Sequence, residues 1–388
     1  MLNYPEGIDD NVFLAEYWQQ RPLVFKNGLA SAVDVISEED LLALASHPEV
    51  ESRLIYTATE DRDYDLEHGP IAKETFKQLT NSPHWTVLVQ SVNLWHKQVA
   101  AVLSQFNFIP NWRLDDIMLS YATDQGSVGP HVDAYDVFLI QIHGTRRWQV
   151  AESNTSYDSY VTECGLSLVS AFEPVIDVVL EPGDILYLPP NVAHHGISEG
   201  NGMTLSVGFR SPAISQLSMM LTEELLTTDS HYRDPNLANE TVKPGEISNA
   251  AMLTAQNWLK QQLTPESIAI AFGKLQTQPK QDPVLEPLAT EVIDSLLKGT
   301  VIHADPAGRL AWWQADTQVH FFANGEHQVF DKTMLPLITL LCSLQAIDLD
   351  SLSAYIGINE TKQILSFLDD VGYLGIQSTD NGNRNVSH

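Results

Sequence analysis

Cysteine is scarce in this chain of 388 residues. Cys164 and Cys342 stand far apart, and no Cys-x-x-Cys pair occurs. Disulfide frameworks and zinc fingers need several cysteines at defined spacings, so the sequence argues against both. Two buried thiols in a reducing compartment are the simplest interpretation.

Positive charge is also in short supply. The chain has 21 Lys and Arg against 50 Asp and Glu, a formal net charge of -29. A surface this acidic repels nucleic-acid phosphates and anionic lipid but attracts basic partners. We therefore predict a basic protein partner and no direct nucleic-acid binding, although solubility or adaptation to salty surroundings would explain the same charge.

Long apolar runs are absent as well. No stretch reaches the roughly 18 consecutive apolar residues of a membrane span. The first residues, MLNYPEGIDDNVFLAEYW, have neither the basic start nor the apolar centre of a secretory signal. The sequence therefore predicts a cytoplasmic protein without membrane association.

Short β-rich runs are what the middle of the chain contains, from about residue 112 to 210. Turn signals separate them, most clearly Glu181-Pro182-Gly183-Asp184, where proline presets the first corner and glycine tolerates positive φ. Regular short strands of this kind are typical of a sandwich or barrel. Ahead of them, Ser37 and the acidic residues that follow it predict a helix start.

The length predicts two or three domains. We expect a β-rich domain at 1–212, a helical region at 213–275 and a last domain at 285–380. The last domain combines a helix, strands at 309–314 and 318–323 before an Asn-Gly turn, and two further helices, which favours a winged-helix-like module.

The helical region carries apolar residues at three- and four-residue steps, which include Leu217, Met220, Leu221 and Leu225. This face would be exposed on a single chain, so we predict a homodimer formed through it. The alternative is that the same residues pack on the β-rich domain of their own chain.

The chemistry is concentrated in Gly129-Pro130-His131-Val132-Asp133. Residues i and i+2 of a strand face the same side, so His131 and Asp133 would point into one space. An imidazole and a carboxylate are two ligands of the facial triad that binds iron(II). The third ligand should follow the strand that ends in Pro-Pro, where both His194 and His195 occur; we favour His194, which stands in a His-x-Gly pattern.

If the iron works with 2-oxoglutarate as its cosubstrate, the distal carboxylate of that molecule needs a buried cation. Arginine matches a carboxylate best. By alternation Arg146 shares a face with Trp148 and Val150, so it should point inward. A structural ion pair with a core carboxylate is the alternative role for Arg146. Ser120, on a preceding strand, can add a hydroxyl donor to the same carboxylate.

Three segments together, residues 129–150, 181–198 and 205–210, resemble the JmjC-type ribosomal oxygenases, also described as cupin-like proteins. The resemblance is to the bacterial branch, which hydroxylates an arginine of a large-subunit ribosomal protein. It implies an α+β fold: a double-stranded β-helix (the JmjC or cupin jelly roll), a helical dimerisation region and a winged-helix-like C-terminal domain.

Carried over by motif, the resemblance places the metal ligands at His131, Asp133 and His194. It places the 2-oxoglutarate residues at Arg146 and Ser120. The cofactors implied are Fe(II), 2-oxoglutarate as cosubstrate and O2, and the partner implied is a ribosomal protein.

Other functions stay open at this stage. The chain could be a different JmjC enzyme, either a histidine hydroxylase or a demethylase, or a non-enzymatic cupin scaffold. A nucleic-acid regulator is the third alternative, but the C-terminal end is acidic where a recognition helix would be basic. Asp124 and Asp136, near the motif, are candidates to hold a substrate guanidinium.

Overall fold

The protein forms two compact units in its computed structural model, one up to Ser211 and one from Pro212 onward. The model describes residues 2–153, 156–225, 230–235, 238, 243–288 and 290–376. The predicted helical region and last domain both lie in the second unit, and residues 377–380 of that domain lie outside the described residues. The three-domain division stays a prediction.

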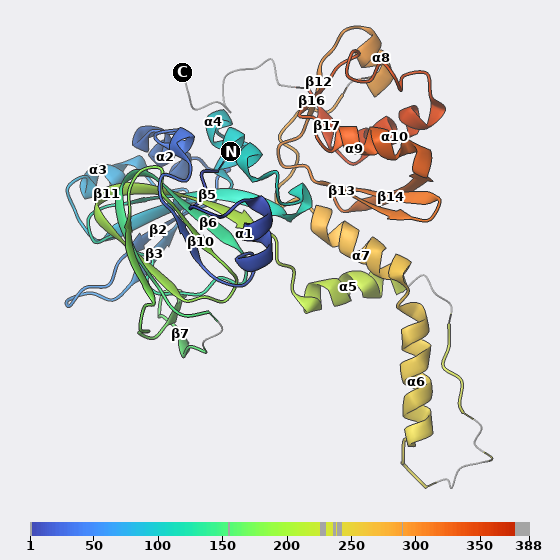
Figure 1. Ribbon diagram of the computed structural model, residues 1–388, viewed down its shortest axis with the longest axis horizontal. Helices are drawn as coiled ribbons and strands as arrows, with labels where there is room; N and C mark the ends of the chain where they lie inside the picture. The colour runs from blue at the N-terminus through green and yellow to red at the C-terminus, as the bar shows by residue number, and fades with distance from the viewer. Residues whose placement is uncertain are drawn as a thin grey trace. The chain divides into compact units, whose positions relative to one another are not determined.

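The first unit is built on long antiparallel strands (Figure 1). Its helices are α1 Asp10–Glu16, α2 Glu38–Ala45, α3 Lys73–Leu79 and α4 Lys97–Val102. Its strands are β1 Leu23–Phe25, β2 Ser52–Tyr56, β3 Asp65–His68, β4 Trp85–Val89, β5 Leu114–Ala122, β6 Val137–Val150, β7 Ser159–Val161, β8 Ser167–Val169, β9 Ile176–Leu180, β10 Ile185–Leu188 and β11 His194–Phe209. Short 3-10 helices lie at Ala30–Ala32, Val92–Leu94, Leu103–Phe106 and Asn111–Arg113.

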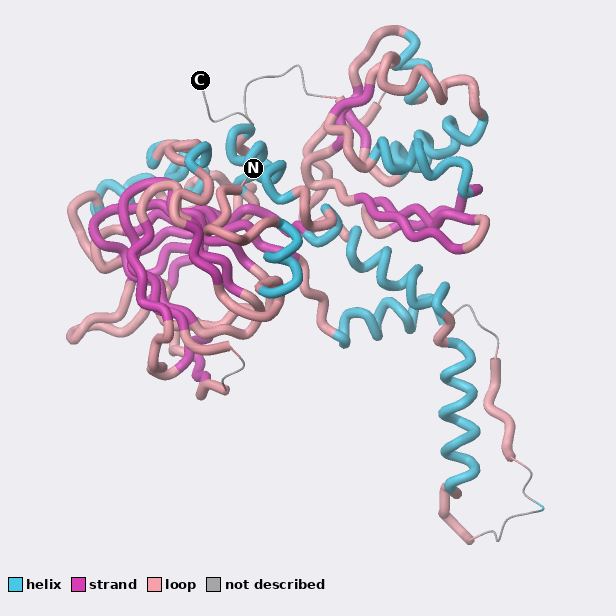
Figure 2. The backbone as a smooth tube through the Cα atoms, in the orientation of Figure 1, coloured by secondary structure: helices cyan, strands magenta, loops and turns pink. Residues whose placement is uncertain are grey.

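Strands β6 and β11 are the two longest strands of this unit and lie side by side within its sheet. They pair with each other along almost their whole length, and the sheet runs in the order β1-β10-β6-β11-β5-β4-β2-β3, with β9 also on β6. Figure 2 shows that these strands curve around an interior. This antiparallel jelly roll confirms the predicted fold class of the first domain.

The core of the first unit is rich in aromatic side chains. Phe138 of β6 lies with its ring centroid 4.9 Å from those of Phe106 and Tyr187, and Phe13 of α1 lies 4.9 Å from Tyr187. Each such pair contributes about 0.5–1.5 kcal/mol beyond its buried area. The cluster therefore fixes α1 and β10 against the sheet.

A bend in β6 decides which of its side chains face the interior. Before the bend the odd positions Val137 and Leu139 belong to the inner apolar cluster, and after it the even positions Trp148 and Val150 do. The bend lies at Gly144, whose φ is +61°, and the register with β11 shifts there. A bulge of this kind shifts the alternation by one residue, which carries Arg146 to the inner face.

Helix α2 begins as predicted. Ser37 accepts a hydrogen bond from the backbone N–H of Asp40, and three acidic residues occupy the first turn. Both features stabilise the amino end of a helix.

The second unit combines helices with two small sheets. Its helices are α5 Ile214–Leu225, α6 Asn249–Gln262, α7 Pro265–Thr277, α8 Val292–Leu297, α9 Leu335–Leu341 and α10 Asn359–Asp370, with a 3-10 helix at Lys332–Met334. Its strands are β12 Ile302–Ala304, β13 Leu310–Ala315, β14 Gln318–Ala323, β15 Glu326–Asp331, β16 Ala346–Ile347 and β17 Leu374–Gly375. The sheets run β13-β14-β15 and β16-β12-β17. The Asn324-Gly325 turn leads into β15, a third strand that the sequence analysis did not predict.

The apolar face predicted for dimerisation is partly covered within the chain. Met220 is buried against Ala271 and Leu275 of α7, and Leu217 and Leu221 pack on the same cluster. These residues therefore do not form a free face of the helix. Other apolar side chains in this region are exposed, among them Ile214, Met219, Met252, Leu253 and Leu259.

No helix in the described ranges is both long and apolar enough to cross a membrane.

A pair of histidines, one buried and one half-buried, lies in the second unit. Nδ1 of His320 is 3.0 Å from Nε2 of His327, and the two rings are stacked. A hydrogen bond between two imidazoles needs one nitrogen without a proton, so at least one ring is neutral. Burial lowers the pKa of His327 to about 4, helped by the neighbouring His320 and Lys274, and burial also lowers the pKa of His320.

We expect acidification to destabilise the second unit between about pH 6.5 and about pH 4. In this window the unfolded chain binds protons that the folded histidine pair does not, so the free energy of unfolding falls as the pH falls. Hydrogen exchange in peptides covering β14 and β15 should report the loss. The variant His327→Gln should weaken this pH dependence, whereas the exposed His68→Gln should leave it unchanged. Equal slopes in the wild type and His327→Gln would contradict this explanation.

Candidate metal centre

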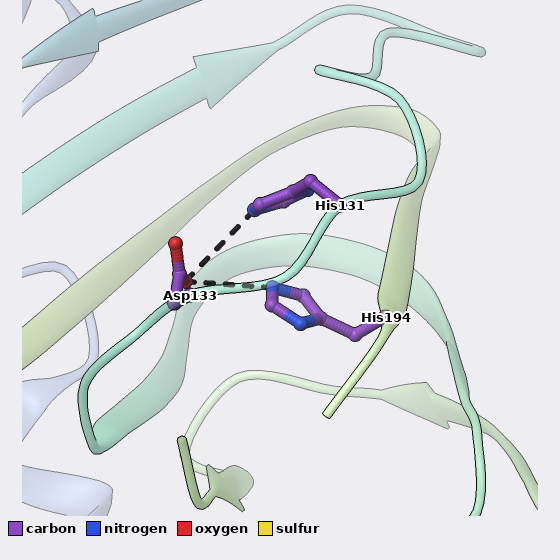
Figure 3. A group of neighbouring side chains, drawn as sticks. All are labelled: His131, Asp133 and His194. Atoms are coloured by element: carbon purple, nitrogen blue, oxygen red, sulfur yellow. Dashed lines mark ion pairs between the residues drawn. The ribbon is translucent and has the colours of Figure 1, made fainter. Parts of the chain in front are cut away.

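His131, Asp133 and His194 converge on one point (Figure 3). Nε2 of His131 lies 3.9 Å from Oδ2 of Asp133, and Nε2 of His194 lies 3.7 Å from the same oxygen. One potential ligand atom from each residue lies within 4.8 Å of the other two. Ligands bound to one ion at about 2.1 Å lie roughly 3 Å apart, so contraction of the three distances by at most about 2 Å would enclose a metal.

The backbone brings the two histidines together. His131 and His194 form an isolated antiparallel bridge, in which each N–H donates to the other residue's C=O at 3.0 Å. Asp133 lies beyond this bridge in the loop before β6, where Asn191 N–H donates to its carbonyl at 2.7 Å. The predicted strand through the motif is thus reduced to one bridged residue, His131. The side chains of His131 and Asp133 still point the same way.

Both histidines have the same tautomer. Nδ1 of His131 lies 2.9 Å from the carbonyl of Gly129, and Nδ1 of His194 lies 3.0 Å from the carbonyl of Val192. A carbonyl only accepts, so Nδ1 carries a proton in each ring and Nε2 is the nitrogen that remains to bind a metal. Second-shell bonds of this kind orient metal-binding histidines.

His194 is held neutral. Its side chain is buried, and burial, together with the neighbouring His131, lowers its pKa to about 4. A metal ligand must be deprotonated at Nε2, so this environment favours ligation at neutral pH.

Arg146 is a buried cation with no anion beside it among the described residues. Its Nη1 lies 3.4 Å from the hydroxyl of Ser120, and its Nη2 donates to the carbonyl of Gly196 at 3.2 Å. Its Nε is buried without a partner, and no carboxylate in the described part of the chain pairs with it. Burial lowers the pKa of Arg146 to about 10, which still leaves the guanidinium charged at neutral pH. An uncompensated buried charge is costly, which points to an anionic ligand.

Gly196 makes room for this arginine. A Cβ atom at Gly196 would stand 2.7 Å from Nε of Arg146 and 2.7 Å from the ring of Trp148. The glycine of the His-x-Gly pattern is therefore required by the arginine and its tryptophan neighbour.

The structure brings His194, and not His195, beside His131 and Asp133. Nε2 of His195 instead lies 3.0 Å from the hydroxyl of Ser127. Burial, Arg146 and His131 lower the pKa of His195 to about 4, so its imidazole is neutral at pH 7.

Asp136 is not available to a substrate, and its candidacy was wrong. Its side chain is fully buried and accepts hydrogen bonds from Tyr187, Gln19 and Arg113 at 2.7, 3.0 and 3.0 Å. Asp124 remains exposed, with Oδ1 accepting from the N–H of Gly200 at 2.8 Å. Asp136 thus belongs to the frame of the domain.

Sequence reasoning missed three neighbours of the triad. Thr57 and Ser127 are buried beside the loop that carries His131, and Tyr135 has its pKa raised by burial and by the carboxylate of Asp133. Thr57 is far from the motif in sequence and gives no signal of its own. Ser127 and Tyr135 flank the motif, but no periodicity distinguishes them from ordinary loop residues.

The residues present fit a divalent metal together with a dicarboxylate. Two imidazoles and one carboxylate face a common point, which is the donor set of the facial triad. The orphaned Nε of Arg146 supplies the cation that a distal carboxylate would need.

Two family models match the chain. A JmjC domain matches residues 101–217, and a ROXA-like winged helix matches residues 255–374. The winged-helix-like prediction is thereby confirmed, and the matched region begins before residue 285.

The chain also resembles two bacterial relatives over most of its length. It is 35% identical over 310 residues to the ribosomal protein uL16 3-hydroxylase of Escherichia coli, covering 78% of this chain and 80% of that protein. It is 35% identical over 303 residues to a probable ribosomal oxygenase of Haemophilus influenzae, covering 77% and 69%.

A solved relative binds a metal together with 2-oxoglutarate. The Escherichia coli ribosomal oxygenase YcfD, in complex with cobalt and 2-oxoglutarate, matches with a TM-score of 0.80 and 32% identity, covering 96% of this chain and 99% of that one. The predicted combination of a metal with 2-oxoglutarate is therefore confirmed at the level of the family. This chain belongs to the JmjC-type ribosomal oxygenases.

Proposed function

We propose that the chain is an Fe(II)- and 2-oxoglutarate-dependent hydroxylase of an arginine side chain in a large-subunit ribosomal protein of the uL16 type. One observation carries the chemistry: the His131–Asp133–His194 cluster shares its β-sandwich with Arg146, a buried cation that no carboxylate in the described ranges pairs with. The substrate follows from the relative whose name states that it hydroxylates uL16. A ribosomal substrate would assign the activity to the cytoplasm.

The site residues form two groups, one that would bind the metal and one that would bind the cosubstrate. His131, Asp133 and His194 would hold iron through two nitrogens and one carboxylate oxygen, leaving positions open for other ligands. Arg146, assisted by Ser120, would hold the distal carboxylate of 2-oxoglutarate. When bound, iron, 2-oxoglutarate and O2 supply the oxidation: one oxygen atom enters a substrate C–H bond, and succinate and carbon dioxide are released.

The surface beside the triad suits a basic protein. Val132 and Tyr135 are exposed on either side of Asp133, so apolar side chains frame the approach to the site. The chain's net charge of -29 attracts a basic segment. Asp124 remains a candidate to hold the substrate guanidinium, because none of the described residues donates a hydrogen bond to its Oδ2.

We expect purified ribosomal proteins incubated with the enzyme, Fe(II), ascorbate and 2-oxoglutarate to gain one oxygen on one arginine-containing peptide. Tandem mass spectrometry measures the gain, and His131→Ala should abolish it because the metal loses a ligand. An oxygen on a histidine peptide, or release of formaldehyde, would replace arginine hydroxylation by another JmjC reaction. No product and no consumption of 2-oxoglutarate would support a non-enzymatic scaffold instead.

We also propose a homodimer formed through α5 and α6. Helix α6 buries none of its own residues, and Met252, Leu253 and Leu259 on it are exposed. Exposed apolar side chains clustered on one element mark an association surface.

Light scattering should give twice the chain mass for the wild type. The double change Met252→Ser and Leu253→Ser should yield a monomer, because it removes the apolar contact. The matched control is Leu297→Ser, which changes an equally exposed leucine on α8. A monomeric wild type would contradict the dimer.

A further inference from the structure

A buried serine sits immediately before the metal-binding motif. Ser127 is 1% exposed, and Thr57 fixes its backbone from both sides. The hydroxyl of Thr57 accepts from Ser127 N–H and donates to Ser127 C=O, each at 2.8 Å. The peptide position of Ser127 is therefore set by β-domain residues outside the motif.

The hydroxyl of Ser127 connects two groups. It accepts from the N–H of Gly129 at 3.0 Å and lies 3.0 Å from Nε2 of His195. The described residues offer this hydroxyl proton no other acceptor, so the proton lies on the bond to His195. Nε2 of His195 is then the acceptor, and the proton of that imidazole is on Nδ1.

Gly129 links Ser127 to the first metal ligand, His131, through two hydrogen bonds. Its N–H is held by Ser127, and its carbonyl accepts from Nδ1 of His131 at 2.9 Å. Its φ is +87°, and a Cβ there would lie 2.9 Å from Leu168, so glycine is required at this turn. A continuous series of hydrogen bonds thus runs from His195 through Ser127 and Gly129 to His131.

We propose that His195 is a positioning residue that acts through Ser127 and Gly129 to fix the tautomer and orientation of His131. The inference rests on the proposed metal site and adds a role for the second of the two adjacent histidines. On strand β11 the two side chains point to opposite faces: His194 faces the metal position, and His195 faces the loop that carries His131. One dipeptide thereby supplies one ligand and orients another.

The opposing possibility is that His195 only fills space. In that case an apolar side chain of similar size would serve equally well, and Ser127 would act alone. The proposal instead requires an acceptor at the position of Nε2. Loss of a partner that hydrogen-bonds and orients a metal-binding histidine weakens metal binding by about 10–100-fold.

The test compares Co(II) affinity, measured by visible absorption in the full-length protein, for the wild type, His195→Leu, His195→Gln and Ser127→Ala. The amide oxygen of glutamine can accept the serine proton, whereas leucine cannot. The matched control is Ser52→Ala, a buried hydroxyl that donates to the carbonyl of Ala45 at 2.8 Å and has no bond to the motif loop. Nitrogen NMR of the metal-free protein reports the tautomer of His131 independently of metal and activity.

We expect His195→Leu and Ser127→Ala each to weaken Co(II) binding by about 10–100-fold and to release the slowly exchanging Nδ1 proton of His131. The double variant should be no weaker than either single one, because both changes break one series of bonds. His195→Gln and Ser52→Ala should bind as the wild type does. If Ser127→Ala does not fold, the comparison of His195→Leu with His195→Gln carries the test.

Wild-type affinity and an unchanged His131 proton in His195→Leu would overturn the proposal, as would additive losses in the double variant. A wild type that does not bind Co(II) would overturn the metal site itself, and this inference with it. The two failures are therefore distinguishable.

Discussion

Two backbone hydrogen bonds between His131 and His194 are the constraint on which the site depends. They join a loop before β6 to the first residue of β11, and they set two imidazole rings with centroids 4.2 Å apart. An isolated bridge has little stability of its own, because closing so long a segment of chain costs entropy. The extended pairing of β6 with β11 offsets that cost, so the sheet that forms the core also assembles the metal position.

The second constraint is electrostatic. Arg146 reaches the interior because β6 bends at Gly144, and it stays there without an anion among the described residues. The ring of Trp148, 5.0 Å from the guanidinium carbon, compensates for part of the lost hydration. The hydration energy that the ring does not replace favours binding of a carboxylate to the guanidinium. The buried charge of Arg146 thus opposes folding of the free protein but promotes binding of the cosubstrate.

Much of this could be read from the sequence because strands alternate with period two. The alternation placed Arg146, Trp148 and Val150 on one face, and the spacing of His131 and Asp133 put both on one side. The argument for Arg146 succeeded because its segment lies wholly beyond the bend at Gly144. From the earlier part of β6 the same rule would have turned Arg146 outward. Two-residue alternation alone cannot detect a bulge; the isolated glycine at 144 within the strand is the sign of it that the sequence contains.

Other parts of the structure depend on tertiary contacts that no local pattern reports. Asp136 looked like a substrate carboxylate, but Arg113 and Tyr187 bind it from distant segments. The apolar face of α5 looked free, but α7 covers Met220. The role of Thr57 beside the motif loop is likewise invisible without the fold.

The central claim is that a metal and a dicarboxylate share the interior of the β-rich domain. The most direct measurement is the thermal stability of the wild type, Arg146→Met and Arg147→Met with Co(II), with and without 2-oxoglutarate. Arg147 is the matched control, because it lies on the outer face and pairs with Asp177 at 2.7 Å. We predict that 2-oxoglutarate stabilises the wild type and Arg147→Met by about 2.7 kcal/mol at a hundredfold excess over Kd. Arg146→Met should gain no stability from 2-oxoglutarate. Without 2-oxoglutarate, Arg146→Met should be no less stable than the wild type. Equal stabilisation of Arg146→Met by 2-oxoglutarate would contradict the account.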